Sequence, residues 1–141
     1  MVIHEVGIAA LVSGVTAQVL KPFVELLQKK QFRLFRVFDS GGMPSSHTAV
    51  VTTLTFGIGA FEGVGSPLFT IALIMGLYFV FEATGLRQEV GHQARVLNEI
   101  VARARQTHHF DADQLQELIG HTWGEVMGGL AIGLLVAFIF F

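Results

Sequence analysis

The residues with the clearest potential for chemistry lie between positions 40 and 48, which read S-G-G-M-P-S-S-H-T. Either Ser45 or Ser46 can N-cap the apolar helix expected after them, so several backbone N–H groups and a helix dipole would point at one spot. Such a spot suits an anion, and phosphate is the usual one. His47 lies beside it and can give or take a proton near neutral pH. The same residues are also compatible with a plain Gly-Pro turn and an ordinary serine cap.

A second constellation reads G-H-T-W-G-E-V at positions 120–126. His121 and Glu125 are four residues apart, so they share a face if the helix already includes both. The carboxylate could hold one imidazole nitrogen and leave the other as base or nucleophile. Thr122 followed by Glu125 three residues later is also the pattern of a capping box. Both interpretations stay open.

The elements that must position these residues are apolar. The chain has 141 residues, of which 52% are apolar and only 14% are charged, whereas a soluble domain has roughly 25% charged residues. Four stretches contain no Asp, Glu, Lys or Arg, and a bilayer crossing needs roughly 20 mainly apolar residues. We therefore expect an all-α polytopic membrane helical bundle with amphipathic helices on its cytoplasmic side. The single domain, 1–141, would have transmembrane helices at 3–20, 46–62, 67–83 and 123–141 and a polar loop at 84–122.

The basic residues set the expected orientation. Lys and Arg occur in two segments only, and the turn at 62–67 has none. Cytoplasmic loops carry an excess of Lys and Arg, so both basic segments should face the cytoplasm, with both termini outside. A prokaryotic inner membrane fits this pattern. No basic residue precedes the first apolar stretch, so we expect a membrane helix there and not a cleaved signal peptide. The basic residues are Lys21, Lys29, Lys30, Arg33, Arg36, Arg87, Arg95, Arg103 and Arg105.

The two basic segments have different characters. In the first, aromatic and basic residues interleave at 32–38, which on a membrane protein indicates an interfacial segment facing anionic headgroups rather than a nucleic-acid site. Pro22 could begin a short helix there. The second contains an apolar stripe at helical spacing from Val90 to Ala104, and a further helix is expected from an N-cap at Asp111 to Gly120. A metal could bind His108, His109, Asp111 and Asp113, but adjacent loop histidines are usually solvated, and we expect no metal.

The last apolar stretch carries closely spaced glycines that let another helix approach in lipid. The partner helix could belong to the same chain or to a second copy. These glycines are Gly124, Gly128, Gly129 and Gly133.

The expected topology brings the reactive residues together. His47 begins the second membrane helix and His121 the fourth, both on the side of the basic loops. Lys21 ends the first helix and Arg87 follows the third, on that same side. Phosphoryl transfer needs this inventory: positive charge on the spectator oxygens, an in-line nucleophile and an acid for the leaving group.

Four blocks of sequence are similar to those of a known family. They are G-G-M-P-S-S-H-T-A at 41–49, A-T-G-L-R-Q-E-V-G-H-Q-A at 83–94, L-N at 97–98 and G-H-T-W-G-E-V at 120–126. Through them, nearly the whole chain resembles the divergent branch of the type 2 phosphatidate phosphatase superfamily, related to acid phosphatases and vanadium haloperoxidases. The chain departs from the pattern at Ser46, where the superfamily has Gly, and at Glu82 and Gln88, where the branch has Asp and Arg.

The resemblance implies a membrane phosphatase for a lipid phosphate or pyrophosphate, acting at the cytoplasmic leaflet through a phosphohistidine. It implies His121 as the nucleophile, Glu125 as the carboxylate that orients it, and His47 as the general acid. No metal or other cofactor is implied, because cations neutralise the charge. The implied phosphate-binding residues are Lys21, Ser45, Ser46 and Arg87.

The first-loop cation that binds phosphate is open among Lys21, Lys29, Arg33 and Arg36. Lys29 and Arg36 have the spacing of the superfamily's first motif, but Val37 replaces its proline. We favour Lys21, because it follows the expected helix end directly.

The expected partners are a phospholipid or prenyl phosphate substrate and the bilayer, with no nucleic acid. The superfamily core has more helices than this chain supplies, which implies a homodimer. Two other functions remain open: a non-catalytic binder or carrier of anionic lipids that keeps the phosphate pocket, and an assembly protein that uses the glycine face.

Overall fold

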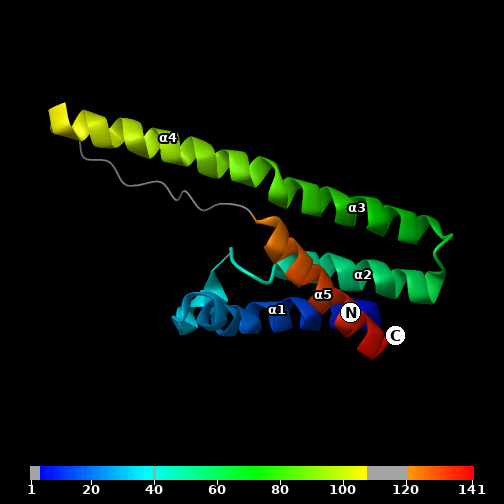
Figure 1. Ribbon diagram of the computed structural model, residues 1–141. Coiled ribbons are helices and arrows are strands. Elements are labelled where there is room, and N and C mark those ends of the chain that lie inside the picture. The colour runs from blue at the N-terminus through cyan, green and yellow to red at the C-terminus, as the bar shows by residue number, and fades with distance from the viewer. Residues whose placement is uncertain (1–3, 40, 108–120) are drawn as a thin grey trace.

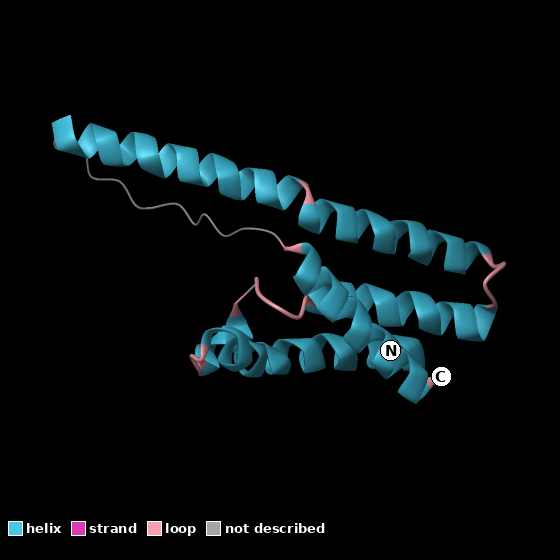
Figure 2. Cartoon of the chain, in the orientation of Figure 1, coloured by secondary structure: helices cyan, strands magenta, loops and turns pink. Residues whose placement is uncertain are grey.

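The chain is helical throughout the part that the structure describes. The computed structural model describes residues 4–39, 41–107 and 121–141, without the side chains of 86–88 and 104–107. Helices and loops account for all of these ranges (Figure 2), so the prediction of an all-α fold is confirmed. The elements are α1 (Glu5–Lys29), the 3-10 helix η1 (Leu34–Phe38), α2 (Ser46–Glu62), α3 (Pro67–Thr84), α4 (Leu86–Thr107) and α5 (Trp123–Phe140).

Helices α1, α2 and α5 pack against one another, and α3 packs on α2 (Figure 1). Helix α4 follows α3 after Gly85 and extends beyond the bundle nearly in line with it. Both termini lie at one end of the bundle, where the Phe61 ring contacts His4 and Phe141 at centroid distances of 5.0 and 5.6 Å. The end of α3 and the starts of α2 and α5 therefore meet at the opposite end.

Small residues allow this close packing. A Cβ on Gly129 would collide with the Ser45 carbonyl oxygen, and one on Gly133 would lie 2.6 Å from Thr52 Cβ. The Thr53 hydroxyl donates a 3.0 Å hydrogen bond across the same interface to the Gly133 carbonyl. Side chains of little volume suit helix pairs in lipid, where close van der Waals contact replaces the hydrophobic effect. Two members of the glycine face expected on the last helix, Gly129 and Gly133, thus pack on α2 of the same chain.

Among the residues that the structure describes, three helical segments are long and apolar enough to cross a membrane: Glu5–Lys29, Pro67–Arg103 and Trp123–Phe140. Helix α2 has 17 residues, and the count of four spans stays a prediction.

The first helix differs from the expectation. It continues through Lys21 and Pro22 to Lys29, so its expected end near position 20 and a new helix start at Pro22 were wrong. An internal proline removes one backbone hydrogen bond. Here Ala17, Lys21 and Glu25 continue one buried face across Pro22, and this packing holds the helix together. The helix expected at 111–120 and the metal-binding alternative around His108 lie outside the described residues.

Candidate active site

His121 and Glu125 form the centre of the candidate site at the start of α5. His121 Nδ1 lies 3.0 Å from Glu125 Oε2, and the His121 side chain is only 2% exposed. An ionised carboxylate only accepts hydrogen bonds, so this contact favours the proton on Nδ1 and leaves the lone pair on Nε2. The same oxygen accepts a 3.1 Å hydrogen bond from the Thr122 N–H, while Thr122 Oγ1 accepts from the Glu125 N–H at 3.3 Å. The capping box and the histidine–carboxylate pair therefore coexist.

The helix does not include both members of that pair. Helix α5 begins at Trp123 with Thr122 as its N-cap, so His121 precedes the cap. The His121 N–H donates a 2.9 Å hydrogen bond to the Ala83 carbonyl near the end of α3. This bond fixes the histidine backbone from a second helix, and no sequence pattern signals it because any residue supplies a carbonyl.

His47 lies in the first turn of α2, beside His121. The two imidazole centroids are 5.9 Å apart with an angle of 47° between the rings. His47 is exposed whereas His121 is buried. The Ser45 N–H donates a 2.9 Å hydrogen bond to the Glu125 carbonyl, which ties the start of α2 to the start of α5.

The two serines have unequal roles. Ser45 is the N-cap of α2, and its buried Oγ accepts hydrogen bonds from the Thr48 N–H at 3.3 Å and the Thr48 hydroxyl at 3.1 Å. Ser46 is the first residue of α2 and is half-buried. The cap that the sequence predicted at this helix start is confirmed at Ser45.

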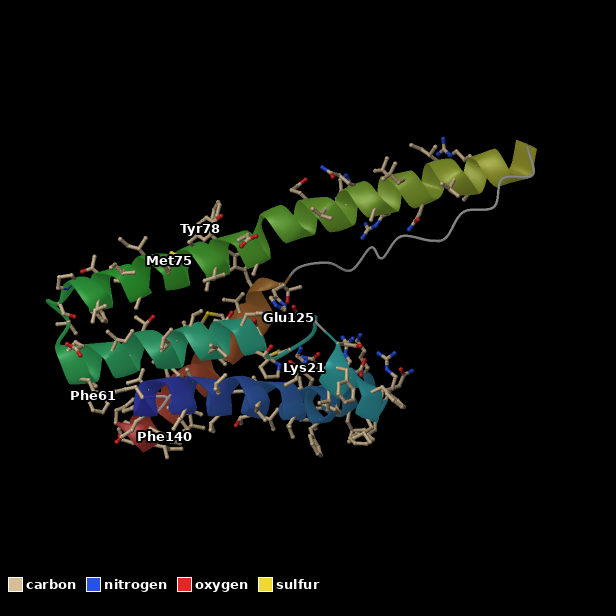
Figure 3. The ribbon with its side chains drawn as sticks, turned by 180° about the vertical axis from the view of Figure 1, so that it is seen from behind. Lys21, Phe61, Met75, Tyr78, Glu125 and Phe140 are labelled. Carbon is tan, nitrogen blue, oxygen red and sulfur yellow. The ribbon has the colours of Figure 1, made fainter. Side chains whose placement is uncertain are left out.

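A cavity of about 230 Å³ lies between α1, η1 and the start of α5. Three cations line it: Lys21, Lys29 and Arg36. Glu125 lines it as well, so this carboxylate joins the cavity to the histidine pair. Figure 3 shows Lys21 and Glu125 at the same end of the bundle.

Lys21 is the most deeply placed of these cations, with 1% of its surface exposed. Its Nζ donates a 2.7 Å hydrogen bond to the Asp39 carbonyl, which ties the residue after η1 to α1. The Lys29 side chain is 60% exposed and that of Arg36 is 23% exposed. A charge in such a buried position acts more strongly on an anion than one in water.

Glu25 is a cavity residue that sequence reasoning missed. Its carboxylate is 4% exposed and pairs with Arg33 at 2.5 Å, Arg36 at 3.7 Å and Lys29 at 3.9 Å. The hydrogen bonds from Arg33 raise the pKa of that guanidinium above its usual value. Its pair with Lys29 has the local i,i+4 spacing of a helix, whereas its pairs with Arg33 and Arg36, eight and eleven positions away, depend on the fold of the connection.

The structure brings together His47, His121, Glu125, Ser45 and Ser46 at one end of the bundle, with Lys21 in the adjoining cavity. Arg87 belongs to the first turn of α4, and its side chain lies outside the described part. A buried imidazole with an orienting carboxylate, a second imidazole beside it and neighbouring cations can support nucleophilic and acid–base chemistry on an anion.

The fold and this arrangement define an all-helical integral membrane protein with a histidine-centred polar site at one end of its bundle. The family model described as "Divergent PAP2 family" matches residues 3–136, and the chain belongs to that family. The chain is similar to "Uncharacterized membrane protein YuiD" of Bacillus subtilis (strain 168). The two are 32% identical over 143 residues, which cover 94% of this chain and 90% of the relative. No solved structure matches the chain. A membrane protein related to the type 2 phosphatidate phosphatases was therefore the correct interpretation of the sequence.

Proposed function

We propose that this protein hydrolyses a phosphomonoester or pyrophosphate headgroup of a membrane lipid through a phosphohistidine at His121. The observation that carries the proposal is the His121–Glu125 contact of 3.0 Å with the His47 ring centroid 5.9 Å from that of His121. Reacting atoms approach to roughly 3–3.5 Å in a near-attack geometry, and imidazoles at this separation are close enough for both to contact one phosphoryl group.

In the first step, His121 Nε2 attacks phosphorus and the bond from phosphorus to the leaving oxygen breaks. His47 gives its proton to that oxygen, so the lipid leaves as an alcohol, or as a lipid monophosphate from a pyrophosphate. In the second step, water attacks the phosphohistidine and His47 takes the proton of that water. The P–N bond breaks, phosphate leaves and His121 is restored.

Positive charge near these residues supports an anionic substrate. Lys21 and Arg36 line the cavity that Glu125 also lines, and the N-terminus of α2 carries the positive end of a helix dipole. Such preorganised charge stabilises the negative charge on the phosphoryl oxygens during transfer. We assign Arg87 to the same task on the strength of the family motif, and Ser46 because it is the first residue of α2, at that N-terminus. These cations make a metal ion unnecessary in the proposed reaction.

An apolar groove favours a lipid over a soluble phosphate ester. The groove has a volume of about 260 Å³ and lies between α2, α3 and α5. It begins beside the site, at Thr48 and Trp123, and reaches Phe56 and Leu73. From Thr48 to Phe56, α2 rises about 12 Å. A hydrocarbon chain attached to a headgroup at His121 could lie along this surface.

Phosphate release from purified protein tests the proposal. The protein, in nanodiscs with a chelator present, is given phosphatidic acid or a prenyl pyrophosphate. We expect release by the wild type, none by His121→Ala, and a loss of roughly 10²–10⁴ in His47→Ala. The matched control is His92→Ala, because His92 is exposed on α4.

Acid-quenched labelling separates the alternatives. A labelled phosphohistidine that disappears in His121→Ala supports the mechanism. Turnover retained in His121→Ala would remove this residue as the nucleophile, and release that vanishes with chelator would indicate a metal site. Saturable lipid-phosphate binding with neither release nor label would favour the non-catalytic lipid carrier.

A further inference from the structure

The segment from Phe32 to Phe38, called here the aromatic segment, presents apolar side chains outward. Phe35 and Phe38 are each 84% exposed, Leu34 is 68% exposed and Phe32 is 51% exposed. Aromatic rings of this size are costly to expose to water when they gather in so short a stretch. Their arrangement therefore calls for a specific apolar neighbour.

The same segment is held firmly on its inner side. Arg33 and Arg36 pair with the buried Glu25 of α1. Gln18 Nε2 donates hydrogen bonds of 2.6 and 3.0 Å to the carbonyls of Val37 and Asp39. Because the polar groups of the segment are turned toward α1, its rings are fixed in the outward direction.

The outward rings continue an apolar surface of α1. Phe32 and Phe23 are in edge-to-face contact, with 5.7 Å between their centroids. Phe23 is 51% exposed and Leu27 is 83% exposed, so the outer surface of α1 stays apolar up to the end of the helix. Helix α1 is long and apolar enough to span a bilayer. The aromatic segment thus lies where that helix leaves the hydrocarbon, the depth that aromatic side chains favour.

The charge of this region distinguishes between a bilayer surface and a second copy of the chain as the neighbour of the rings. Between Glu25 and Asp39 the chain has four basic and two acidic residues, and Lys29 and Lys30 are exposed. Basic clusters directly after a membrane-spanning helix attract anionic lipids. A symmetric dimer through this patch would place its excess positive charge against itself. The bilayer surface fits both the rings and the charge.

We infer that the aromatic segment is an interfacial anchor, which inserts its rings at the headgroup level and binds anionic phospholipids through Lys29 and Lys30. This inference does not depend on the proposed phosphatase activity, since it rests on exposed surface and charge. It assigns a lipid contact to residues outside the histidine site.

The depth of the rings tests the anchor. The chain has no cysteine, so Phe35→Cys accepts a single nitroxide label at an exposed position without disturbing buried contacts. In nanodiscs we expect this label to collide more with oxygen than with a water-soluble nickel chelate. The control, Gln93→Cys on the exposed side of α4, should show the reverse. Equal nickel access at both positions would overturn the anchor, and so would spin–spin coupling between copies, which would make the patch a dimer interface.

The selectivity of the protein for anionic lipids tests the role inferred for Lys29 and Lys30. Spin-labelled phosphatidylglycerol and phosphatidylcholine are compared for the fraction immobilised by the protein. We expect a severalfold preference for phosphatidylglycerol in the wild type, falling toward parity in a Lys29→Gln, Lys30→Gln double variant. The control, Arg95→Gln on α4, should keep the preference. A wild type without preference, or a double variant that retains it, would overturn the assignment of anionic lipids.

Discussion

Glu125 accepts hydrogen bonds from two different donors through one carboxylate oxygen. Oε2 accepts a hydrogen bond from the Thr122 N–H at 3.1 Å and lies 3.0 Å from Nδ1 of the His121 ring. Capping stabilises the start of α5, and the ring contact fixes the orientation and tautomer of the histidine. Substitutions on either side of this carboxylate can separate its contribution to stability from its contribution to chemistry.

Glu125→Gln should leave the fold intact and abolish most activity. Both donors face Oε2, so the Gln amide oxygen in that place can accept from the Thr122 N–H and from the His121 Nδ1–H. The negative charge that stabilises the imidazolium is then lost, and we expect kcat to fall by roughly 10⁴, as in other histidine–carboxylate pairs changed to an amide. Phosphate release and the melting temperature in detergent measure the two effects.

Thr122→Ala is the complementary change. It removes the Oγ1 acceptor of the capping box but leaves the His121–Glu125 contact. We expect a loss of about 1 kcal/mol in the free energy of unfolding, with kcat unchanged within a small factor. A Thr122→Ala protein as inactive as Glu125→Gln would show that the cap, and not the charge of the carboxylate, is what activity requires.

Lys21 and Lys29 offer a matched test of the phosphate-binding cation. Lys21 is 1% exposed, while the Lys29 side chain is 60% exposed and already near Glu25. A hydrogen bond to a charged group contributes about 1.5–3 kcal/mol, so Lys21→Gln should raise KM by roughly tenfold to a hundredfold. Exposed ion pairs contribute about 0–1 kcal/mol, so Lys29→Gln should change KM less than roughly fivefold. The reverse order would assign the role to Lys29.

Local patterns predicted part of this site. The Ser45 cap and the Thr122–Glu125 box are signals within four residues, and both are present. The backbone bond from His121 to Ala83 and the Glu25 ion pairs with Arg33 and Arg36 have no such signal, because they depend on how distant segments pack. Arg87 stays a prediction, since the structure does not describe its side chain.

At the scale of elements, the contact between α2 and α5 sets the geometry of the site. The two helices are tied at the Ser45–Glu125 backbone bond and pack through Gly129 and Gly133. Spacing alone predicted a glycine face but not its partner, because small residues fit a helix of the same chain or of a second copy equally well.

Gly129→Ala should separate these helices. Its Cβ would meet the Ser45 carbonyl oxygen and Thr48 Cβ, and backbone cannot move aside cheaply. We expect a loss of about 1–3 kcal/mol in stability, together with reduced activity as the Ser45 end of α2 shifts. The neighbouring Gly128→Ala is the control, because its Cβ would meet Met43 Cε at 3.1 Å and Pro44 Cβ at 3.3 Å, contacts that a shift of a few tenths of an ångström relieves. Unfolding in detergent and phosphate release report on both variants, and equal effects would argue against the backbone clash.

Helices α1 and α4 show where patterns fall short. A proline after an apolar run indicates a helix end, yet α1 continues through Pro22 because its buried face continues. The amphipathic helix predicted in the second basic segment is present as α4, and Ala94 on its stripe is buried. Val90 and Leu97 on the same stripe are 41% and 48% exposed. Periodicity predicts a helix, whereas the burial of its apolar side depends on how other elements of the fold pack against it.

At the scale of the whole molecule, the number of membrane crossings depends on α2. Its 17 residues rise about 26 Å, slightly less than the hydrocarbon thickness of roughly 30 Å, and such a mismatch costs only fractions of a kcal/mol per ångström. The start of α2 bonds to the start of α5 through Ser45 and Glu125, and Phe61 at its end contacts Phe141. Helix α2 therefore extends over the same depth as α5, so we expect α2 to cross a bilayer that α5 crosses.

Two single cysteines test this argument, since the chain has none of its own. Val64→Cys lies in the turn after α2, and Gln31→Cys lies after α1 among the basic residues; both positions are exposed. With four crossings and the basic segments inside, an impermeant maleimide should label Val64→Cys in intact bacterial cells, and Gln31→Cys only after permeabilisation. Labelling of both cysteines from one side would mean that α2 does not cross the membrane. Labelling of Gln31→Cys in intact cells, and of Val64→Cys only after permeabilisation, would mean that the site faces the outside. Two observations favour opposite sides of the membrane for the two cysteines: α2 extends over the same depth as α5, and the α2–α3 turn has no basic residue.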